Sequence, residues 1–442
     1  MQTSSEAKRL VDRVLTLAGA TKGAEALVRV SSAREGNTRF AVNELTSAGD
    51  VERLTVQLTV QFGQRSASAA TNQQDDRSLD DLVTRVVRMA RLAPENPEAM
   101  PVLGHQSYTP AKTAVDPATV KLTPDVRAKA AAAAIAAGDA AKLGMAGFVR
   151  HAGESLALGT TAGLAAYHAW TTCEMSCTAR TPDGTGSGWA GLGSNRMADL
   201  DPGALAKTAA DKATASAQPR RLDPGRYTVI LEPAAVASLA AFFAYSFDAR
   251  RADEGRSYFT KHRPGDKLFS EAISLRTDPT DAALGATPFD REGLPIAARR
   301  WVDKGVVTGL PYSRYWAKKQ DKLPTGVGGG WALDGGTATR DELIKGVPRG
   351  VLITRFWYLR PVDLQTLLVT GLTRDGVFLI ENGAIAHPVN NFRFNESPIQ
   401  MLARCDGLTA TAIPSGGETD GGFRVPALRS HEFNLASISE AI

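Results

Sequence analysis

Histidine and cysteine are the residues of this chain that could bind a catalytic metal. A catalytic zinc needs three protein ligands and one open coordination position. The six histidines lie far apart in the sequence, and no two of them have the spacing that places both on one face of a helix: His105, His151, His168, His262, His387 and His431. The residues alone therefore predict no zinc site in this chain.

Cys173 and Cys177 are the two cysteines that lie near each other. Residues four apart on a strand point to the same face and are ~13 Å apart, which suits neither a disulfide nor a shared metal. The third cysteine, Cys405, stands in the stretch MLARCDG. Because 3 cysteines in 442 residues make no disulfide framework, we expect reduced thiols.

Two further motifs could do chemistry but do not meet its requirements. The glycines at 326, 328, 329 and 330 could form a phosphate loop, but no Lys-Ser or Lys-Thr pair follows them as a Walker motif requires. No G-x-S-x-G elbow occurs, and the nearest stretch, 184–188, has the wrong spacing for a serine nucleophile. We expect a flexible or tightly turning glycine loop and no serine hydrolase.

Arg39, Phe40 and Asn43 in NTRFAVNEL form a more specific candidate site. A guanidinium and a carboxamide at this spacing could hold a backbone carboxylate or amide. A surface loop with a solvated arginine explains the same residues equally well.

Helix and strand patterns alternate at the start of the chain. The capping box Thr3-Ser4-Ser5-Glu6 opens a helix. Strands are expected at 25–30 and 54–62, and the second alternates strictly between apolar and polar residues, as a half-buried antiparallel strand does. A second helix is expected at 78–91.

The next section continues in the same way. Pro124 in a first turn and the alanine run after it predict a helix that packs closely on a sheet. Strand patterns cover 148–177, with hairpin-like breaks at 152–153 and 162–164. A polar, alanine-rich helix is expected at 205–217.

Beyond the linker QPRRLDPG the pattern changes to many short strands with glycine turns. Asp375-Gly376 and Asn382-Gly383 are both hairpin dipeptides. We therefore predict an α+β protein: a mixed α/β amino-terminal region with an antiparallel sheet, followed by a β-rich, barrel-like carboxy-terminal domain. The expected parts are 1–115, 116–217 and 218–442.

The charge balance of the chain argues against a nucleic-acid surface. Lys and Arg number 51 and Asp and Glu 47, so the net charge is +4, and the basic residues are scattered. The first residues lack the apolar core of a signal peptide, and no window approaches the ~18 apolar residues of a membrane span. We expect a soluble, cytoplasmic protein with no membrane and no direct nucleic-acid contact.

Several stretches, in the same order along the chain, resemble the TldD/TldE family, whose second member is also called PmbA. They are NTRFAVNEL, AQPRRLDPGRYTVILEPAAVASL, ATPFDREGLPIAARRWVDKGVVTGL, PTGVGGG and FLIENGAIAHPVNNFRF. Catalytic members of the family carry a helix reading H-E-x-x-x-H, in which two imidazoles bind zinc and the carboxylate activates water.

With the G-x-S-x-F segment at 255–259 in register, the three motif positions fall at about Ala240, Ala241 and Tyr245. The family's catalytic members add a cysteine in a glycine-rich stretch near the C-terminus. The comparable stretch here, IPSGGETDGGFRV, has none, and Cys405 lies upstream of it. The resemblance therefore implies a TldE/PmbA-like member without the zinc-binding motif.

The resemblance also implies a function. The chain would be the non-catalytic subunit of a heterodimeric TldD/TldE zinc metallopeptidase that acts on unfolded or leader peptides, with zinc in the TldD-like partner and no cofactor here. The candidate binding residues are Arg39 and Asn43, in an element that the family keeps facing its interior cavity, and Glu381 and Asn382 of the I-E-N-G hairpin. The family's label "modulator of DNA gyrase" has no counterpart in these residues.

Two alternatives stay open. One is a stand-alone, self-associating protein that binds peptides or a small ligand without cleaving them. The other is a metal-independent hydrolase whose residues the sequence does not reveal.

Overall fold

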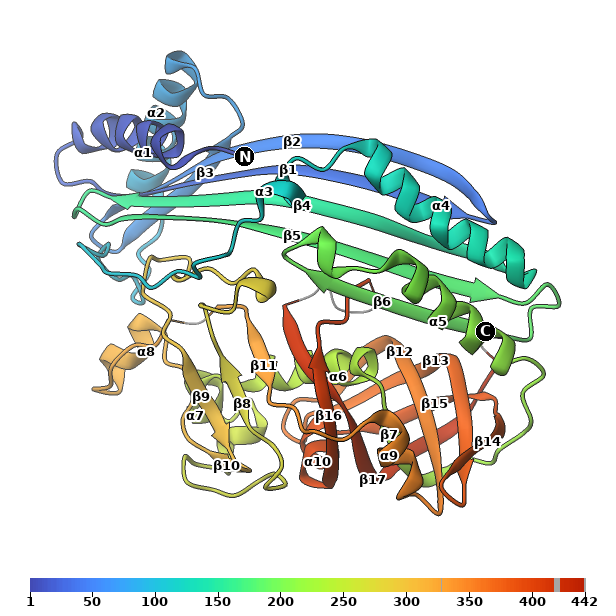
Figure 1. Ribbon diagram of the computed structural model, residues 1–442. Coiled ribbons are helices and arrows are strands. Elements are labelled where there is room, and N and C mark those ends of the chain that lie inside the picture. The colour runs from blue at the N-terminus through green and yellow to red at the C-terminus, as the bar shows by residue number, and fades with distance from the viewer. Residues whose placement is uncertain (327, 417–421, 441–442) are drawn as a thin grey trace.

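A computed structural model describes residues 1–326, 328–416 and 422–440. Among these residues, six strands form an antiparallel sheet in the order β3-β2-β1-β4-β5-β6 (Figure 1). Its strands are β1 (Glu25–Ala41), β2 (Glu44–Phe62), β3 (Arg65–Thr71), β4 (Gly144–Thr160), β5 (Ala165–Arg180) and β6 (Ser187–Ser194). The predicted antiparallel sheet of the amino-terminal region is thus confirmed.

The helices of this region pack against that sheet: α1 (Ser4–Gly19), α2 (Asp76–Leu92), α3 (Pro117–Val120), α4 (Pro124–Ala141) and α5 (Pro202–Ala215). The capping box at Thr3 is confirmed, since its hydroxyl accepts from the Glu6 amide and the Glu6 carboxylate accepts from the Thr3 amide. The alanine face of α4 is buried, which brings the helix close to the strands, as the alanine run predicted.

Eleven of the described strands form the second, carboxy-terminal sheet. They are β7 (Gly225–Leu231), β8 (Leu275–Thr277), β9 (Arg299–Asp303), β10 (Val306–Val307), β11 (Trp331–Leu333), β12 (Arg349–Asp363), β13 (Leu368–Glu381), β14 (Ala384–Pro388), β15 (Asn391–Glu396), β16 (Cys405–Ala412) and β17 (Phe423–Ser439). Strand β7 pairs with both β12 and β17, which closes β7, β12, β13, β15 and β17 into a ring. The β-rich, barrel-like prediction is confirmed.

Helix α6 (Pro233–Ser246) packs against β12 and β17 of this ring, and most of its residues are buried. Its apolar side chains join one large core with aromatic residues of the ring strands. The remaining described helices are short: α7 (Ala249–Asp253), α8 (Arg314–Lys319), α9 (Arg340–Lys345) and α10 (Pro398–Ala403), with 3-10 turns η2 (Tyr258–Thr260) and η3 (Ala282–Leu284), and η1 (Met197–Asp199) between β6 and α5.

Two of the expected hairpin breaks are wrong. Ala152 and Gly153 lie inside β4. Strands β1 and β5 pair with them on both sides, so β4 continues through these residues without a turn. Asp375 and Gly376 lie inside β13 as a β-bulge, with φ of +57° and +116°, because β13 continues to pair with β12 on both sides of them. The hairpin at 382–383 is confirmed.

The expected parts 1–115 and 116–217 contribute strands to one sheet, because β1 pairs with β4. The residues between α5 and β7 connect that sheet to the second one. The division into three parts stays a prediction. No helix among the described residues is both long and apolar enough to span a membrane.

Candidate functional site

Helix α6 carries the positions that the family resemblance assigns to the zinc motif. Ala240 is buried in the core and Ala241 is partly exposed, and neither methyl group has a lone pair for a metal. Tyr245 is 66% exposed, and its hydroxyl accepts a 2.6 Å hydrogen bond from Arg251, whose guanidinium also lies 4.0 Å from the ring centroid. These side chains do not fit a zinc ion.

Other metal-binding residues do not gather elsewhere in the part of the chain that the structure describes. Within it, no three His, Cys, Asp or Glu side chains form a group that could hold a metal ion. Cys405 is buried at the start of β16, where burial raises the pKa of its thiol to about 12. The glycine-rich stretch after it is only partly described, because residues 417–421 lie outside the described residues.

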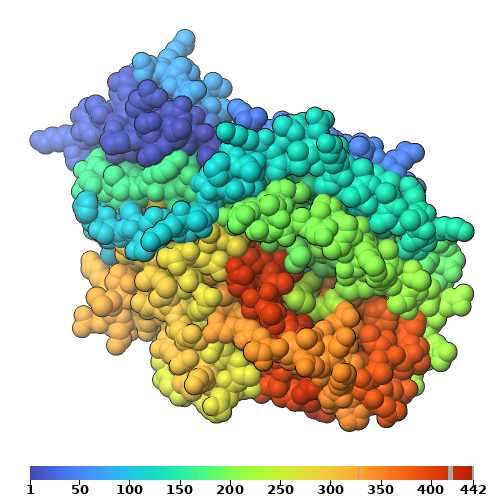
Figure 2. Space-filling model, in the orientation of Figure 1, coloured from blue at the N-terminus to red at the C-terminus, as the bar shows by residue number. Residues whose placement is uncertain are grey.

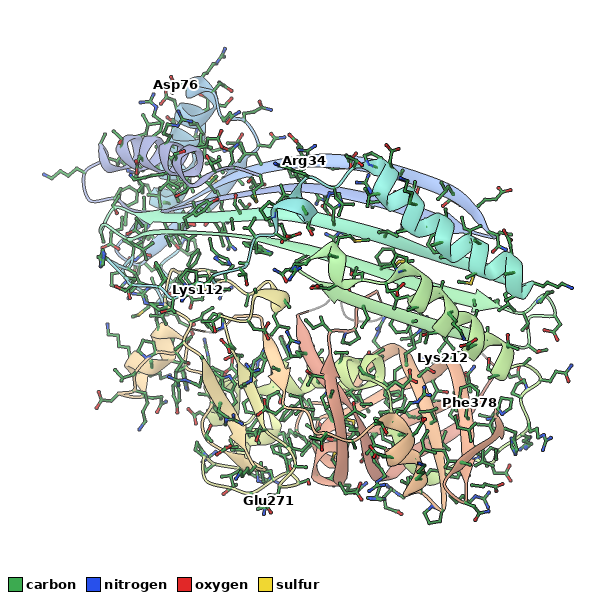
Figure 3. All side chains as sticks on the ribbon, viewed as in Figure 1. Arg34, Asp76, Lys112, Lys212, Glu271 and Phe378 are labelled. Carbon is green, nitrogen blue, oxygen red and sulfur yellow. The ribbon has the colours of Figure 1, made fainter. Side chains whose placement is uncertain are left out.

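The amino-terminal end of α6 is fixed by charge. Pro233 occupies the first turn, and the carboxylate of the preceding Glu232 is bound by Lys212 and by Arg340, the latter at 3.3 Å. Lys212 also donates to the Trp189 carbonyl of β6 at 3.2 Å, and it lies on the side of α5 that faces the carboxy-terminal sheet (Figure 3). Lys212 therefore ties α6 to the six-stranded sheet.

A cavity of about 280 Å³ lies between the two parts of the molecule. The amino-terminal part (blue to green) lies over the carboxy-terminal part (yellow to red), and a red segment meets the green surface between them (Figure 2). The described residues that line the cavity are Arg150, Glu154, Thr172, Cys173, Glu174, Gly193, Ser194, Ala283, Leu284, Gly285, Ile413, Ser415 and Gly422. They come from β4, β5, β6, η3 and the segment after β16.

Charged side chains from neighbouring strands meet at this cavity. Arg150 on β4 donates to Glu35 on β1 at 2.6 Å and to Glu174 on β5 at 3.2 Å. Burial raises the pKa of the Glu154 carboxyl, and the charge of Arg150 opposes part of that rise. A carboxyl that keeps its proton to higher pH beside an arginine can donate as well as accept a hydrogen bond, which is the chemistry of a polar ligand site.

Residues 413–415 close the cavity on the side of β6. The Gly193 amide donates to the Ile413 carbonyl at 2.9 Å, and the Ser415 hydroxyl donates to Glu174. A Cβ at Gly191 would lie 2.2 Å from the Ser415 carbonyl oxygen, so glycine is required for this close approach. The edge of β6 is therefore covered by the chain itself.

Cys173 is the lining residue with a potential nucleophile. Its thiol donates to the Ser194 carbonyl at 3.2 Å, and burial raises its pKa to about 12, as burial also does for Cys177 on the same strand. A thiol that stays protonated at neutral pH is a poor nucleophile and a poor metal ligand. All three cysteines are buried and free of disulfide bonds among the described residues.

The structure does not bring the four predicted binding residues together. Arg39 is exposed on β1, whereas Glu381 and Asn382 are exposed on the β13–β14 hairpin of the other sheet. Asn43 stands at the β1–β2 turn, where its amide donates to Asp139 and to the Leu143 carbonyl and accepts from the Met145 amide. These bonds fix the turn between α4 and β4. A binding role for the four residues stays a prediction.

Sequence reasoning missed Arg150, Glu154 and Glu174. The available signal was a set of charged residues within otherwise buried strand segments, because such residues are rarely buried unless they are paired. The glycine loop is a packing element instead: a Cβ at Gly326 would lie 2.4 Å from the Pro295 carbonyl oxygen.

Comparisons with known proteins give the family. The pattern of the PmbA/TldA metallopeptidase central domain matches residues 115–217, and that of the PmbA/TldA metallopeptidase C-terminal domain matches residues 224–437. A protein named "Metalloprotease" from Methanothermobacter thermautotrophicus is 29% identical over 161 residues, which are 33% of this chain and 34% of that protein. "Metalloprotease PmbA" of Escherichia coli O157:H7 is 26% identical over 144 residues, 30% of each chain.

These alignments span about a third of the length of each curated relative. Solved structures agree over almost the whole fold. TldE from Thermococcus kodakarensis has a TM-score of 0.86 at 16% identity, covering 97% of this chain and 100% of that chain. A Thermotoga maritima protein described as a candidate modulator of a DNA gyrase has a TM-score of 0.85 at 20% identity, with the same coverage.

The solved structures show the fold alone at these identities, and the two matched domain patterns cover more than half of the sequence. This chain belongs to the PmbA/TldA metallopeptidase family.

Proposed function

We propose that this chain is a TldE/PmbA-like subunit without a metal site of its own. In this proposal it pairs with a zinc-bearing TldD-like subunit to form a heterodimeric metallopeptidase that acts on unfolded or leader peptides. The observation that carries the proposal is helix α6, which packs against β12 and β17 and has Ala240, Ala241 and Tyr245 where the resemblance places the motif. The names of the relatives, metalloproteases, support the peptidase class.

The cavity beneath β4 and β5 supports a role in holding substrate. An extended peptide presents amides and carbonyls, and Glu154, Arg150 and Ser194 offer both donors and acceptors at this wall. Pairing of a peptide with the β6 edge is less favoured, because Ser216 bonds both backbone groups of Ser187 there. Contact through side chains in the cavity is therefore the expected mode.

A second candidate function is a stand-alone protein that binds peptides or a small ligand without cleaving them. The cavity favours it, because its wall carries both hydrogen-bond donors and acceptors, such as Arg150 and Glu154. The two candidates differ in whether this chain forms a stable complex with a zinc-bearing homologue.

The first experiment follows zinc and association together. This chain, a TldD-like homologue from the same host and their mixture are separated by size exclusion, and zinc in each peak is measured by elemental analysis. We expect no stoichiometric zinc in this chain alone, and a mixed peak with about one zinc per heterodimer, held by the partner. A tightly held zinc in this chain alone, or separate elution of the two chains, would count against the proposal.

A further inference from the structure

A larger pocket lies at one end of the five-strand ring, and it shares no lining residue with helix α6 or with the cavity beneath β5. It has a volume of about 960 Å³, and its described lining comes from the start of β7, η2, the β12–β13 turn, the end of β15, α10 and β17. Strands β15 and β17 and helix α10 lie together in the lower part of Figure 1. Its volume is in the range of small-molecule sites.

Two guanidinium groups converge at the wall of this pocket. Arg226 at the start of β7 and Arg404 after α10 donate to the same carbonyl oxygen, that of Glu432, at 2.9 and 3.0 Å. Glu432 has a φ of +55° within a bulge of β17, which turns its carbonyl toward both arginines. A neutral carbonyl does not offset two positive charges, and like charges this close repel one another.

The carboxylate that faces them is Glu396, and it is already engaged. It is 5% exposed, and its two oxygens accept from the backbone amides of Ser397 at 2.9 Å and Asn434 at 3.1 Å. Arg404 approaches one of these oxygens at 3.9 Å, beyond a direct hydrogen bond. Burial raises the pKa of Glu396, so its negative charge is held less readily than that of a free carboxylate.

Positive charge therefore exceeds negative charge among the described residues of the lining. Arg226, Lys261 and Arg404 are cations, and Glu396 is the one acid among these lining residues. His262 adds an imidazole, which Asp266 approaches at 3.6 Å from outside the lining. Convergent arginines with spare N–H groups match the planar oxygens of carboxylates and phosphates.

We propose that this pocket binds an oxyanion group, either the carboxylate of a peptide end or the phosphate of a small molecule. The proposal does not depend on the heterodimer or on zinc, because none of the described lining residues is one of the α6 motif positions. It assigns to this chain a ligand site of its own.

The test uses the full chain alone and isothermal titration calorimetry. The probes are inorganic phosphate, an N-acetylated tripeptide with a free terminal carboxylate, and the same tripeptide with an amidated end. Saturable binding of phosphate or of the free-acid tripeptide supports the proposal. The probe with the higher affinity shows whether the natural ligand group is a phosphate or a peptide carboxylate. The amidated tripeptide is expected to bind at least about tenfold more weakly than the free acid if the carboxylate is the ligand group.

Variants locate the site. Arg226→Gln is expected to lower about tenfold the affinity for the probe that binds, because an exposed guanidinium is lost without disturbing the core. Arg221→Gln is the matched control, since Arg221 lies five residues before Arg226 in the chain, has a 78% exposed side chain and pairs with Asp223 outside the pocket. Arg404→Gln is a second variant, with folding of each checked by circular dichroism.

No saturable binding of phosphate or of the free-acid peptide by the unaltered chain overturns the proposal. Equal weakening by Arg226→Gln and Arg221→Gln also overturns it, because general charge would then explain the binding. Absence of a heterodimer would leave this result unchanged, so the two proposals fail separately.

Discussion

Glu154 is a cavity residue whose carboxyl pKa is raised by the fold. Burial is the main cause of its raised pKa, because a charged carboxylate loses hydration between β4 and the carboxy-terminal part. The partner that limits this effect is Arg150, which is shared with Glu35 and Glu174. A shared arginine stabilises each of several carboxylates less than it would stabilise one.

Replacing Glu154 by Gln should change how stability depends on pH. In the unaltered chain, ionisation of Glu154 penalises the folded state as pH rises from its ordinary value of 4.5 through the raised pKa. Glu154→Gln removes this penalty, so its melting temperature relative to the unaltered chain should rise across that range and then level off. The exposed Glu44→Gln is the control. A difference that stays constant from pH 4.5 upward contradicts the assignment.

The buried pair of Arg355 and Asp375 is a second feature at the scale of single residues. Their side chains are 9% and 0% exposed, the guanidinium Nε lies 2.6 Å from the carboxylate, and Ser187 of β6 donates to the other oxygen at 2.5 Å. Asp375 thus connects the ring to the six-stranded sheet through one carboxylate.

Removing that carboxylate should be costly. Asp375→Ala leaves the Arg355 charge buried without its partner, and we expect a loss of about 3–5 kcal/mol in the free energy of unfolding. Asp341→Ala, at an exposed acid of α9, should change it by less than about 0.5 kcal/mol. Denaturant unfolding measures both, and equal effects of the two substitutions would show that the buried pair contributes little.

At the scale of elements, local patterns predicted what local bonds decide. The capping box at Thr3 and the alanine helix from Pro124 were predicted because each depends on residues within one or two turns. The predicted hairpin at 375–376 is wrong for the same reason: the prediction used only local residues, and a hairpin turn and a β-bulge both accept positive φ. The pairing of β13 with β12 on both sides of the dipeptide distinguishes the two, and the local sequence does not show it.

The segment 413–415 against β6 gives a prediction at this scale. Gly191→Ala places a methyl group against the Ser415 carbonyl, so the segment must shift, and overpacking of this kind costs about 1–3 kcal/mol. Gly309→Ala is the matched control, because nothing lies within 4 Å of a Cβ at that position. In Gly191→Ala, the free energy of unfolding measured with denaturant should fall and limited proteolysis near the segment should become faster. No difference between Gly191→Ala and Gly309→Ala would contradict the described contact.

At the scale of the whole molecule, the fold class could be predicted from the change of pattern after residue 217, and the charged cavity could not. Arg150, Glu35 and Glu174 stand on three strands that are distant in sequence, and only the order β1-β4-β5 brings them together. The positions on α6 came from resemblance to a family, since two alanines and a tyrosine carry no signal by themselves.

The central claim is that this chain supports a partner's catalysis and has none of its own. An unfolded peptide is incubated with this chain, with a TldD-like homologue from the same host, and with both, and cleavage is followed by mass spectrometry. A partner whose H-E-x-x-x-H glutamate is replaced by glutamine serves as the inactive control. We expect cleavage by the mixture, little by the partner alone and none by this chain. If the partner alone cleaves as fast as the mixture, or this chain cleaves by itself, the account is wrong.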